Sequence, residues 1–319
     1  QGQRHQEPAR SHLLGRSHQR RIALLEQRRA LADTVGRARD YGAAAIDALD
    51  IFPDTVIRRT LADVVSFCIG QPDFPTPRHI RNAVTEAMEQ GNTKYTQTPG
   101  IPELREAVAA MTTRRLGVAY SPDETIVTTG AKMALYELFQ ATLDPGDEVV
   151  LFGPYWTSYV EMIGLAGGTA VVVPTHASDG FRPDPAALRA ALTPRTRLVL
   201  LNSPSNPTGA TYDRRTLESI AEVLAPTDAL VVSDDIYDRI TFDGRPFANL
   251  AQLGPEWRAR TVVVNGTSKA YSMTGFRIGW ALGPKPVIAA MGKIQDQSTS
   301  GPTSFSQYGA LAAVTGPQN

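Results

Sequence analysis

Short apolar runs alternate with helix-length segments from about residue 60 to the end of the chain. The runs are rich in Val and Leu and lack a clean apolar–polar alternation, which is typical of strands covered by helices on both faces. They are 125–129, 148–152, 169–173, 197–202, 229–233 and 261–265. The segments between them predict helices at 131–143, 155–166, 185–192 and 213–224. We therefore expect an α/β fold with three αβα layers and a mostly parallel sheet.

Composition excludes several classes of protein. The 319 residues include 32 basic and 32 acidic side chains, so no net charge favours nucleic acid or an anionic membrane. The single cysteine, Cys68, excludes an intramolecular disulfide framework and a cysteine-rich metal site. No apolar run approaches the roughly 20 residues that a membrane span needs. His79 and His176 are isolated, so we expect no metal site. The single cysteine fits a reducing compartment, and we expect a cytoplasmic protein without a nucleic-acid or membrane partner.

The first 40 residues differ from the rest because they are rich in arginine and histidine. We expect residues 1–60 to be a basic arm, partly disordered or helical over 22–32, followed by one large domain over 61–319. An Arg-rich targeting peptide is an alternative that Glu7 and Glu26 weaken. A DNA-binding module is another, but no clear helix-turn-helix pattern is present.

Polar residues follow four of the predicted strands. Residues 128–132 (TTGAK) end one strand and open a helix, where small residues let backbone N–H groups approach an anion. An ordinary tight turn explains this segment equally well, and it matches neither common nucleotide-binding motif. Asn206, Asp234, Tyr237 and Lys269 lie just after three further strands. Ligands bind at the carboxyl ends of parallel strands, so an amide, a carboxylate, a phenol and an amine are predicted to meet there.

The longest motif covers residues 266–279 (GTSKAYSMTGFRIG). It resembles the pyridoxal 5′-phosphate (PLP) attachment motif of class I and II aminotransferases of fold type I. Further matching motifs occur in the family's order, namely 69–74, 94–96, 100–105, 154–156, 206–209 and 234–237. The similarity covers about residues 64–319 and is strongest to the bacterial aspartate aminotransferase branch, which includes prephenate and aromatic-acid members.

The resemblance implies a role for each matching residue. Lys269 would form a Schiff base with PLP and then move the substrate proton, which requires a neutral amine. Arg277 would bind the cofactor phosphate, a task that suits a bidentate guanidinium. The remaining phosphate contacts would come from Gly130, Ala131, Lys132 and Ser268.

Other implied roles concern the cofactor ring, the substrate and a second subunit. Asp234 would pair with the pyridinium nitrogen, while Tyr237 and Asn206 would bind the phenolic oxygen of the ring. Trp156 would stack on the ring. Tyr95 would reach the phosphate in a neighbouring subunit, which implies a homodimer with shared sites. The substrate contacts implied are Gly70, Trp156 and Asn206.

The sequence departs from the family pattern in two places. Family members continue after the helix near 303–315 into a small domain whose arginine binds the substrate carboxylate, and we expect that domain to be absent here. Residues 40–63 do not match the family's substrate-closing motif. We expect amino transfer from an acidic or aromatic amino acid to a 2-oxo acid, with little activity in this chain. Alternatives are β-elimination, cyclisation or oxidation with the same cofactor, an inactive fragment, or a regulatory domain.

Overall fold

The computed structural model describes residues 70–318. The chain divides into two compact units, Gln1–Gln71 and Pro72–Asn319. Only Gly70 and Gln71 of the first unit are described. The predicted basic arm and the predicted domain boundary after residue 60 therefore lie outside the described residues.

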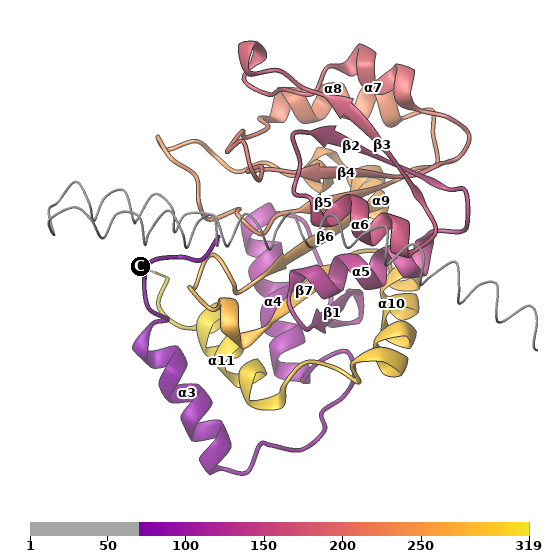
Figure 1. The fold of residues 1–319 in the computed structure, drawn as a ribbon. Helices are drawn as coiled ribbons and strands as arrows, with labels where there is room; N and C mark the ends of the chain where they lie inside the picture. The colour runs from indigo at the N-terminus through magenta and orange to yellow at the C-terminus, as the bar shows by residue number, and fades with distance from the viewer. Residues whose placement is uncertain (1–69, 319) are drawn as a thin grey trace, which may run out of the picture. The chain divides into compact units, whose positions relative to one another are not determined.

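The second unit contains a seven-stranded sheet with the strand order β1-β7-β6-β5-β4-β2-β3 (Figure 1). Its strands are β1 Thr125–Thr128, β2 Glu148–Gly153, β3 Thr169–Pro174, β4 Thr196–Asn202, β5 Leu230–Asp234, β6 Thr261–Gly266 and β7 Gly279–Leu282. All six predicted strands are confirmed, and each boundary lies within one residue of its prediction. Strand β7 was not predicted; it runs antiparallel to both of its neighbours, while the other neighbouring pairs are parallel.

Helices occupy the segments between the strands and both ends of the unit. They are α3 Arg78–Glu89, α4 Pro102–Leu116, α5 Ala131–Thr142, α6 Ser158–Leu165, α7 Pro185–Ala191, α8 Arg214–Leu224, α9 Pro255–Arg260, α10 Lys285–Ser298 and α11 Ser304–Thr315. The four predicted helices are confirmed, although α6 begins later than predicted because residues 154–157 form a loop. Helices α3 and α11 pack against each other although most of the unit's sequence separates them (Figure 1).

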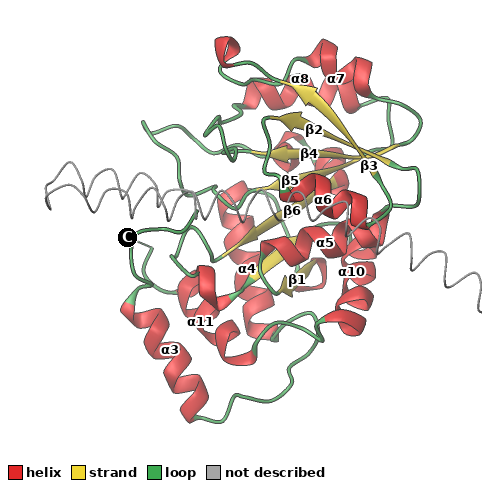
Figure 2. Ribbon diagram, viewed as in Figure 1, coloured by secondary structure: helices red, strands yellow, loops and turns green. Residues whose placement is uncertain are grey.

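Helices cover both faces of the sheet, which confirms the predicted three-layer architecture (Figure 2). On β4, Leu198 and Leu200 join a buried cluster with side chains of α5, α6 and α10. Val199 and Leu201 point to the opposite face and pack with α7, α8 and α9. Helices α4 and α11 cover the part of this second face formed by β1, β6 and β7. The central strands are apolar in succession because both of their faces are buried.

The residues around Gly130 fix the point at which helix α5 begins. Gly130 precedes the helix with φ of +82°, a conformation that favours glycine. The carbonyl of Gly130 accepts hydrogen bonds from the N–H groups of Met133 and Ala134, which starts the helix beside the end of β1. No described helix is long and apolar enough to cross a membrane.

Candidate functional site

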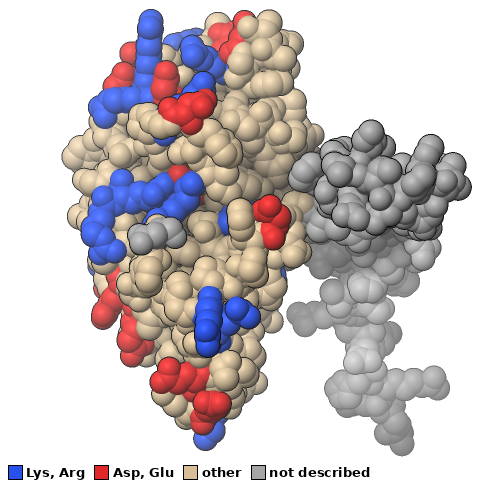
Figure 3. All heavy atoms as spheres, turned by 90° about the vertical axis from the view of Figure 1, so that its left-hand side faces the viewer, with Lys and Arg blue, Asp and Glu red and all other residues tan. Residues whose placement is uncertain are grey.

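Three neighbouring strands bring the predicted polar residues to one edge of the sheet. Asn202 at the end of β4 pairs in register with Asp234 at the end of β5, and Asp234 pairs with Val264 of β6. Figure 3 views the side toward which the arrowheads of β2 and β4 point in Figure 1, and a group of basic atoms lies at mid-height on the left of that face. The carboxyl ends of these strands therefore meet at one edge of the sheet.

Asp234 is a buried carboxylate, with 3% of its surface exposed. Its Oδ2 accepts a hydrogen bond of 2.6 Å from the Tyr159 hydroxyl, and its Oδ1 accepts one of 3.2 Å from the Ile236 N–H. Burial raises the pKa of Asp234 to about 6, although both hydrogen bonds act in the opposite direction. An opposing positive group at this position would therefore stabilise the ionised carboxylate.

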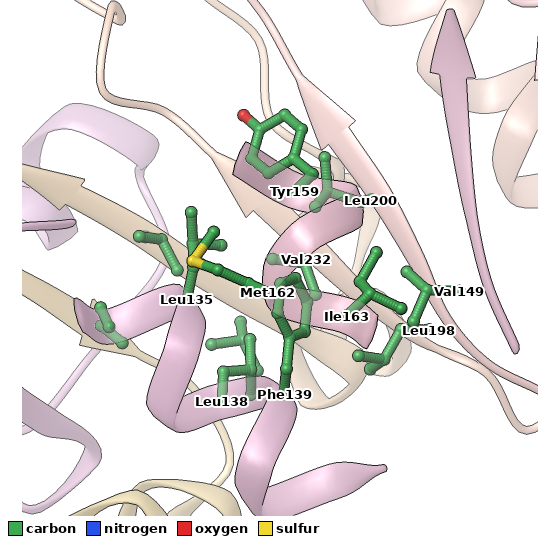
Figure 4. Close-up of a cluster of buried hydrophobic side chains, with 14 of the residues drawn as sticks. Leu135, Leu138, Phe139, Val149, Tyr159, Met162, Ile163, Leu198, Leu200 and Val232 are labelled. Atoms are coloured by element: carbon green, nitrogen blue, oxygen red, sulfur yellow. The ribbon is translucent and has the colours of Figure 1, made fainter. Parts of the chain in front are cut away.

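Tyr159 lies at the margin of the apolar cluster beneath the site (Figure 4). Its ring packs with that cluster, and its hydroxyl points away from the labelled aliphatic side chains. Burial raises the pKa of this phenol well above its usual value, and the neighbouring Asp234 adds to the shift. The hydroxyl therefore stays protonated and acts as a fixed donor to Asp234.

Asn206 lies in the loop after β4, and Tyr237 lies in the loop after β5. The Asn206 Nδ2 group is 3.5 Å from the Tyr237 hydroxyl, which is long for a hydrogen bond. Asn202 holds this pair in place, because its Oδ1 accepts 2.8 Å from the Asn206 N–H and its Nδ2 donates 2.9 Å to the Asp234 carbonyl. Burial is the main cause that raises the pKa of Tyr237, and Asp234 contributes.

Lys269 lies in the loop after β6 and is half-buried. Its Nζ is 5.8 Å from the centre of the Tyr237 ring. Partial burial lowers the pKa of Lys269, and the positive charge of Arg277 lowers it further. Both effects increase the fraction of neutral, nucleophilic amine at this position.

Arg277 packs against the start of α5. A Cβ atom on Gly130 would lie only 2.6 Å from the Arg277 Nη2, so a larger residue there would force the guanidinium to move. Arg277 has φ of +56°, which is uncommon for a residue with a side chain, and its Nη1 donates 2.9 Å to the Thr274 carbonyl. Gly279 lets β7 approach even closer, because a Cβ there would lie 2.1 Å from the Ala131 nitrogen.

Lys132 and Trp156 form a contact at the opening of the same helix. The Lys132 Nζ is 4.7 Å from the Trp156 ring centre, and that ring meets Tyr159 edge-on at 5.3 Å. Partial burial lowers the pKa of Lys132, and Arg277 adds to this effect. No ion pair between described residues involves Lys132 or Arg277. These two cations and the N-terminal N–H groups of α5 together make a site for an anion.

Comparison with known proteins identifies the family to which this chain belongs. The family model described as "Aminotransferase class I and II" matches residues 62–319. The chain belongs to the class I and II aminotransferase family. Aspartate/prephenate aminotransferase of Thermus thermophilus is 48% identical over 259 residues, which are 81% of this chain and 66% of the relative. Aspartate aminotransferase of Geobacillus stearothermophilus is 48% identical and covers 80% of this chain and 65% of the relative.

Solved structures agree with this assignment. The structure of the aspartate aminotransferase from Rhizobium meliloti matches with a TM-score of 0.77 at 47% identity, covering 78% of this chain and 63% of that one. The predicted resemblance to the aspartate aminotransferase branch is thereby confirmed. This aminotransferase-family chain spans about two thirds of the length of the curated relatives that it matches.

Class I and II aminotransferases use PLP as cofactor, and the described residues fit that molecule. Its phosphate suits the anion site at the start of α5, where Gly130 leaves room for Arg277. Its protonated ring nitrogen suits the buried carboxylate of Asp234, whose pKa burial has raised. Its aldehyde suits the amine of Lys269, whose pKa is lowered.

Three further residues belong to the predicted site, namely Ser268, Tyr95 and Gly70. Ser268 is buried next to Lys269, and its carbonyl accepts 3.1 Å from the Met273 N–H. The Tyr95 side chain is 96% exposed. Gly70 is exposed with φ of +62° and belongs to the other unit, so its role remains a prediction.

Sequence reasoning assigned no role to Tyr159, Asn202 or Gly279. Tyr159 donates to Asp234, Asn202 fixes the Asn206 loop, and Gly279 permits the close contact of β7 with α5. Two signals were available: Asn202 ends a predicted strand, and Gly279 closes the longest motif. Tyr159 lies among apolar residues and carries no such signal.

Proposed function

We propose that the protein transfers an amino group between an amino acid and a 2-oxo acid, with PLP attached to Lys269. The observation that carries this proposal is the convergence of an activated amine, a buried carboxylate and an anion site on one sheet edge. When bound, the cofactor supplies an electron sink for the carbanion that forms at the substrate Cα. The protein residues bind, orient and exchange protons around it.

Each residue has a distinct task in this proposal. Asp234 keeps a proton on the ring nitrogen, and Tyr159 holds its carboxylate in position. The Lys269 Nζ would take the proton from the substrate Cα and return it across the imine nitrogen to the former aldehyde carbon of the cofactor, which needs the neutral amine favoured by Arg277. Arg277 grips the phosphate with Gly130, Ala131, Lys132 and Ser268.

Further residues orient the ring and the substrate. Trp156 covers a face of the ring, and Tyr237 with Asn206 binds its phenolic oxygen. A cavity of about 450 Å³ opens beside Asn206 and Tyr237 between segments 204–211 and 237–245. We assign the substrate to this side, with Gly70 as a further contact by similarity. An acidic amino acid is supported by the names of the aspartate/prephenate and aspartate relatives. An aromatic one is supported by the similar structure of the aromatic aminotransferase from Pyrococcus horikoshii, which matches with a TM-score of 0.76 at 37% identity.

Covalent labelling tests the attachment residue. The purified chain is incubated with PLP, reduced with borohydride and digested, and the labelled peptide is identified by mass spectrometry. We expect the label on Lys269 and its loss in Lys269→Ala. The matched control is Lys132→Ala, which weakens phosphate binding but leaves the label on Lys269. Label on Lys132 in the unmodified protein would contradict the assignment.

A half-reaction with aspartate or an aromatic amino acid tests the type of chemistry. Transfer converts the cofactor to its amino form and releases the intact 2-oxo acid. Elimination would instead release ammonia and a fragment of the substrate side chain. Detection of that fragment, with the cofactor returned unchanged, would replace transamination by elimination.

The proposal also includes a cytoplasmic homodimer with shared sites. The exposed phenol of Tyr95 supports the dimer, because a partner's phosphate would give it a contact. The single cysteine supports a reducing compartment. Mixing Tyr95→Ala with Lys269→Ala subunits should regenerate one complete site per hybrid dimer and restore tight cofactor binding there. A monomer in sedimentation, or no gain on mixing, would contradict shared sites.

A further inference from the structure

A second pair of aspartates lies next to the site carboxylate but belongs to a separate network. Asp235 and Asp238 are 3% and 5% exposed. The Asp238 N–H donates 2.9 Å to the Asp235 carbonyl, and the Asp235 N–H donates 2.8 Å to the Val264 carbonyl of β6. These bonds close a tight turn after β5, and Tyr237 is part of that turn.

Neutral groups hold Asp235. Its Oδ1 accepts 2.7 Å from the Ser233 hydroxyl, and its Oδ2 accepts 2.7 Å from the Asn249 amide. Burial is the main cause that raises the pKa of Asp235 well above its usual value, and the charge of Asp238 adds to it. Asp235 thus anchors the start of the turn without an ion pair among the described residues.

Asp238 joins three elements of the fold. The Arg115 Nε from the last turn of α4 lies 2.5 Å from the Asp238 Oδ2, and the Arg115 Nη2 donates to the Asp238 carbonyl. Arg115 therefore holds Asp238 by an ion pair to its carboxylate and a hydrogen bond to its main chain. The third element is β6, because the side chain of Asn265 there lies close enough to lower the pKa of the Asp238 carboxyl by hydrogen bonding.

Asn265 connects this carboxylate to the loop that carries Lys269. Its Oδ1 accepts 2.7 Å from the Gly266 N–H at the very end of β6, so its amide group can face Asp238. Lys269 follows three residues later. One buried carboxylate therefore fixes both the turn that carries Tyr237 and the strand end that precedes Lys269.

We propose that Asp238, held by Arg115, is a positioning residue that sets the placement of Tyr237 relative to Lys269. It does so through Asn265, and the proposal rests on the proposed role of Lys269 as the attachment residue. Second-layer carboxylates act in this way because they remove the freedom of the groups that touch the ligand. Burial raises the pKa of Asp238 and Arg115 opposes that shift, so the ion pair stabilises the charge on this carboxylate.

The test separates positioning from stability. Removing one partner of a buried ion pair is strongly destabilising, whereas replacing both by apolar residues of similar size often restores stability. We therefore compare Asp238→Asn, Asp238→Glu and the double variant Arg115→Met/Asp238→Leu. The control is Asp123→Asn, which removes an exposed aspartate lying 3.5 Å from the Lys285 Nζ.

Two readouts are measured besides the unfolding midpoint. In the cofactor-free protein, the acetylation rate of Lys269 relative to the exposed Lys293 is followed across pH by peptide mass spectrometry. In the loaded protein, PLP affinity is measured by absorbance. We expect the double variant to unfold near the wild-type midpoint, with a displaced Lys269 pH profile. We also expect roughly tenfold weaker PLP binding, the size of effect seen when an outer-layer partner of a metal site is lost. Asp238→Glu should retain most of the affinity.

Two outcomes would overturn the role of Asp238. One is a double variant with a wild-type Lys269 profile and wild-type PLP affinity. The other, if the double variant does not fold, is Asp238→Asn with both readouts unchanged. Failure of the proposed function is distinct: the wild-type protein would then take no label from PLP at Lys269, while the acetylation profile would still report on positioning.

Discussion

Gly279→Ala should separate the start of α5 from β7. The added Cβ would lie 2.1 Å from the Ala131 nitrogen and 2.4 Å from the Gly130 carbonyl carbon. Unstrained contacts of this kind are about 3.5 Å, so the two backbones must part by about 1.4 Å. No side-chain rotation can relieve the clash, because the atoms in the way belong to the main chain.

We expect a loss of about 3 kcal/mol in the free energy of unfolding, the upper end of overpacking costs. The displaced segment begins α5 and lines the anion site, so PLP should also stabilise the variant less than it stabilises the wild type. Urea denaturation with and without PLP measures both effects.

Gly275→Ala is the matched control for this substitution. It lies in the same motif, and a Cβ there would meet nothing within 4 Å. We expect its unfolding free energy to stay close to that of the wild type. Equal unfolding free energies for the two variants, with equal stabilisation by PLP, would refute the close-packing argument.

Three further predictions concern buried charge and glycine conformation. Asp234→Asn should stabilise the cofactor-free protein by up to about 3 kcal/mol at neutral pH but not below about pH 4, because the raised pKa makes ionisation costly in the folded state; it should also weaken PLP binding. Denaturation across pH checks this, and a neutral-pH stability below that of the wild type would contradict it. Glu137 is fully buried, both of its carboxyl oxygens lack a hydrogen-bond partner among residues 70–318, and burial raises its pKa to about 8. Wild-type stability should therefore fall as pH rises from 4.5 to about 8, and Asp234 contributes to this fall below about pH 6. Glu137→Gln should reduce the slope, most clearly between about pH 6 and 8, and gain up to about 5 kcal/mol above it; an unchanged slope between pH 6 and 8 would disprove the assignment. Gly130→Ala and Gly117→Ala both force a side chain into positive φ, but only the former crowds Arg277; equilibrium dialysis should show weaker PLP binding in Gly130→Ala alone.

The local pattern of apolar residues was sufficient to predict the strands that helices cover on both faces. Continuous Val- and Leu-rich runs have few alternatives when turn residues flank them, and β4 and β6 are confirmed almost to the residue. Strand β7 was missed because it has only four residues, Gly279–Leu282, and follows a loop motif. Its strand conformation depends on pairing with β1 and β6, which lie far away in the sequence.

Part of the candidate site was likewise predicted from the sequence, and part was not. Asn206, Asp234 and Lys269 were predicted to meet because parallel neighbouring strands end at one edge, and the register of β4, β5 and β6 places their loops together. The Tyr159 hydroxyl and the link between Asp238 and Arg115 were not predicted. Both contacts join residues more than 70 positions apart, and the polar atoms involved lie on otherwise buried segments.

The sequence by itself determined the family, the order of the elements and the polar residues that meet at the ends of the strands, because these depend on short-range periodicity and on motifs at strand ends. Tertiary structure decided the electrostatic character of those residues. Lys269 is an ordinary lysine in the sequence, and its pKa falls only because folding buries it beside Arg277. The pKa of Asp234 rises because the surrounding strands and α6 exclude water from it. Desolvation and charge proximity are properties of the packed molecule, and no local pattern encodes them.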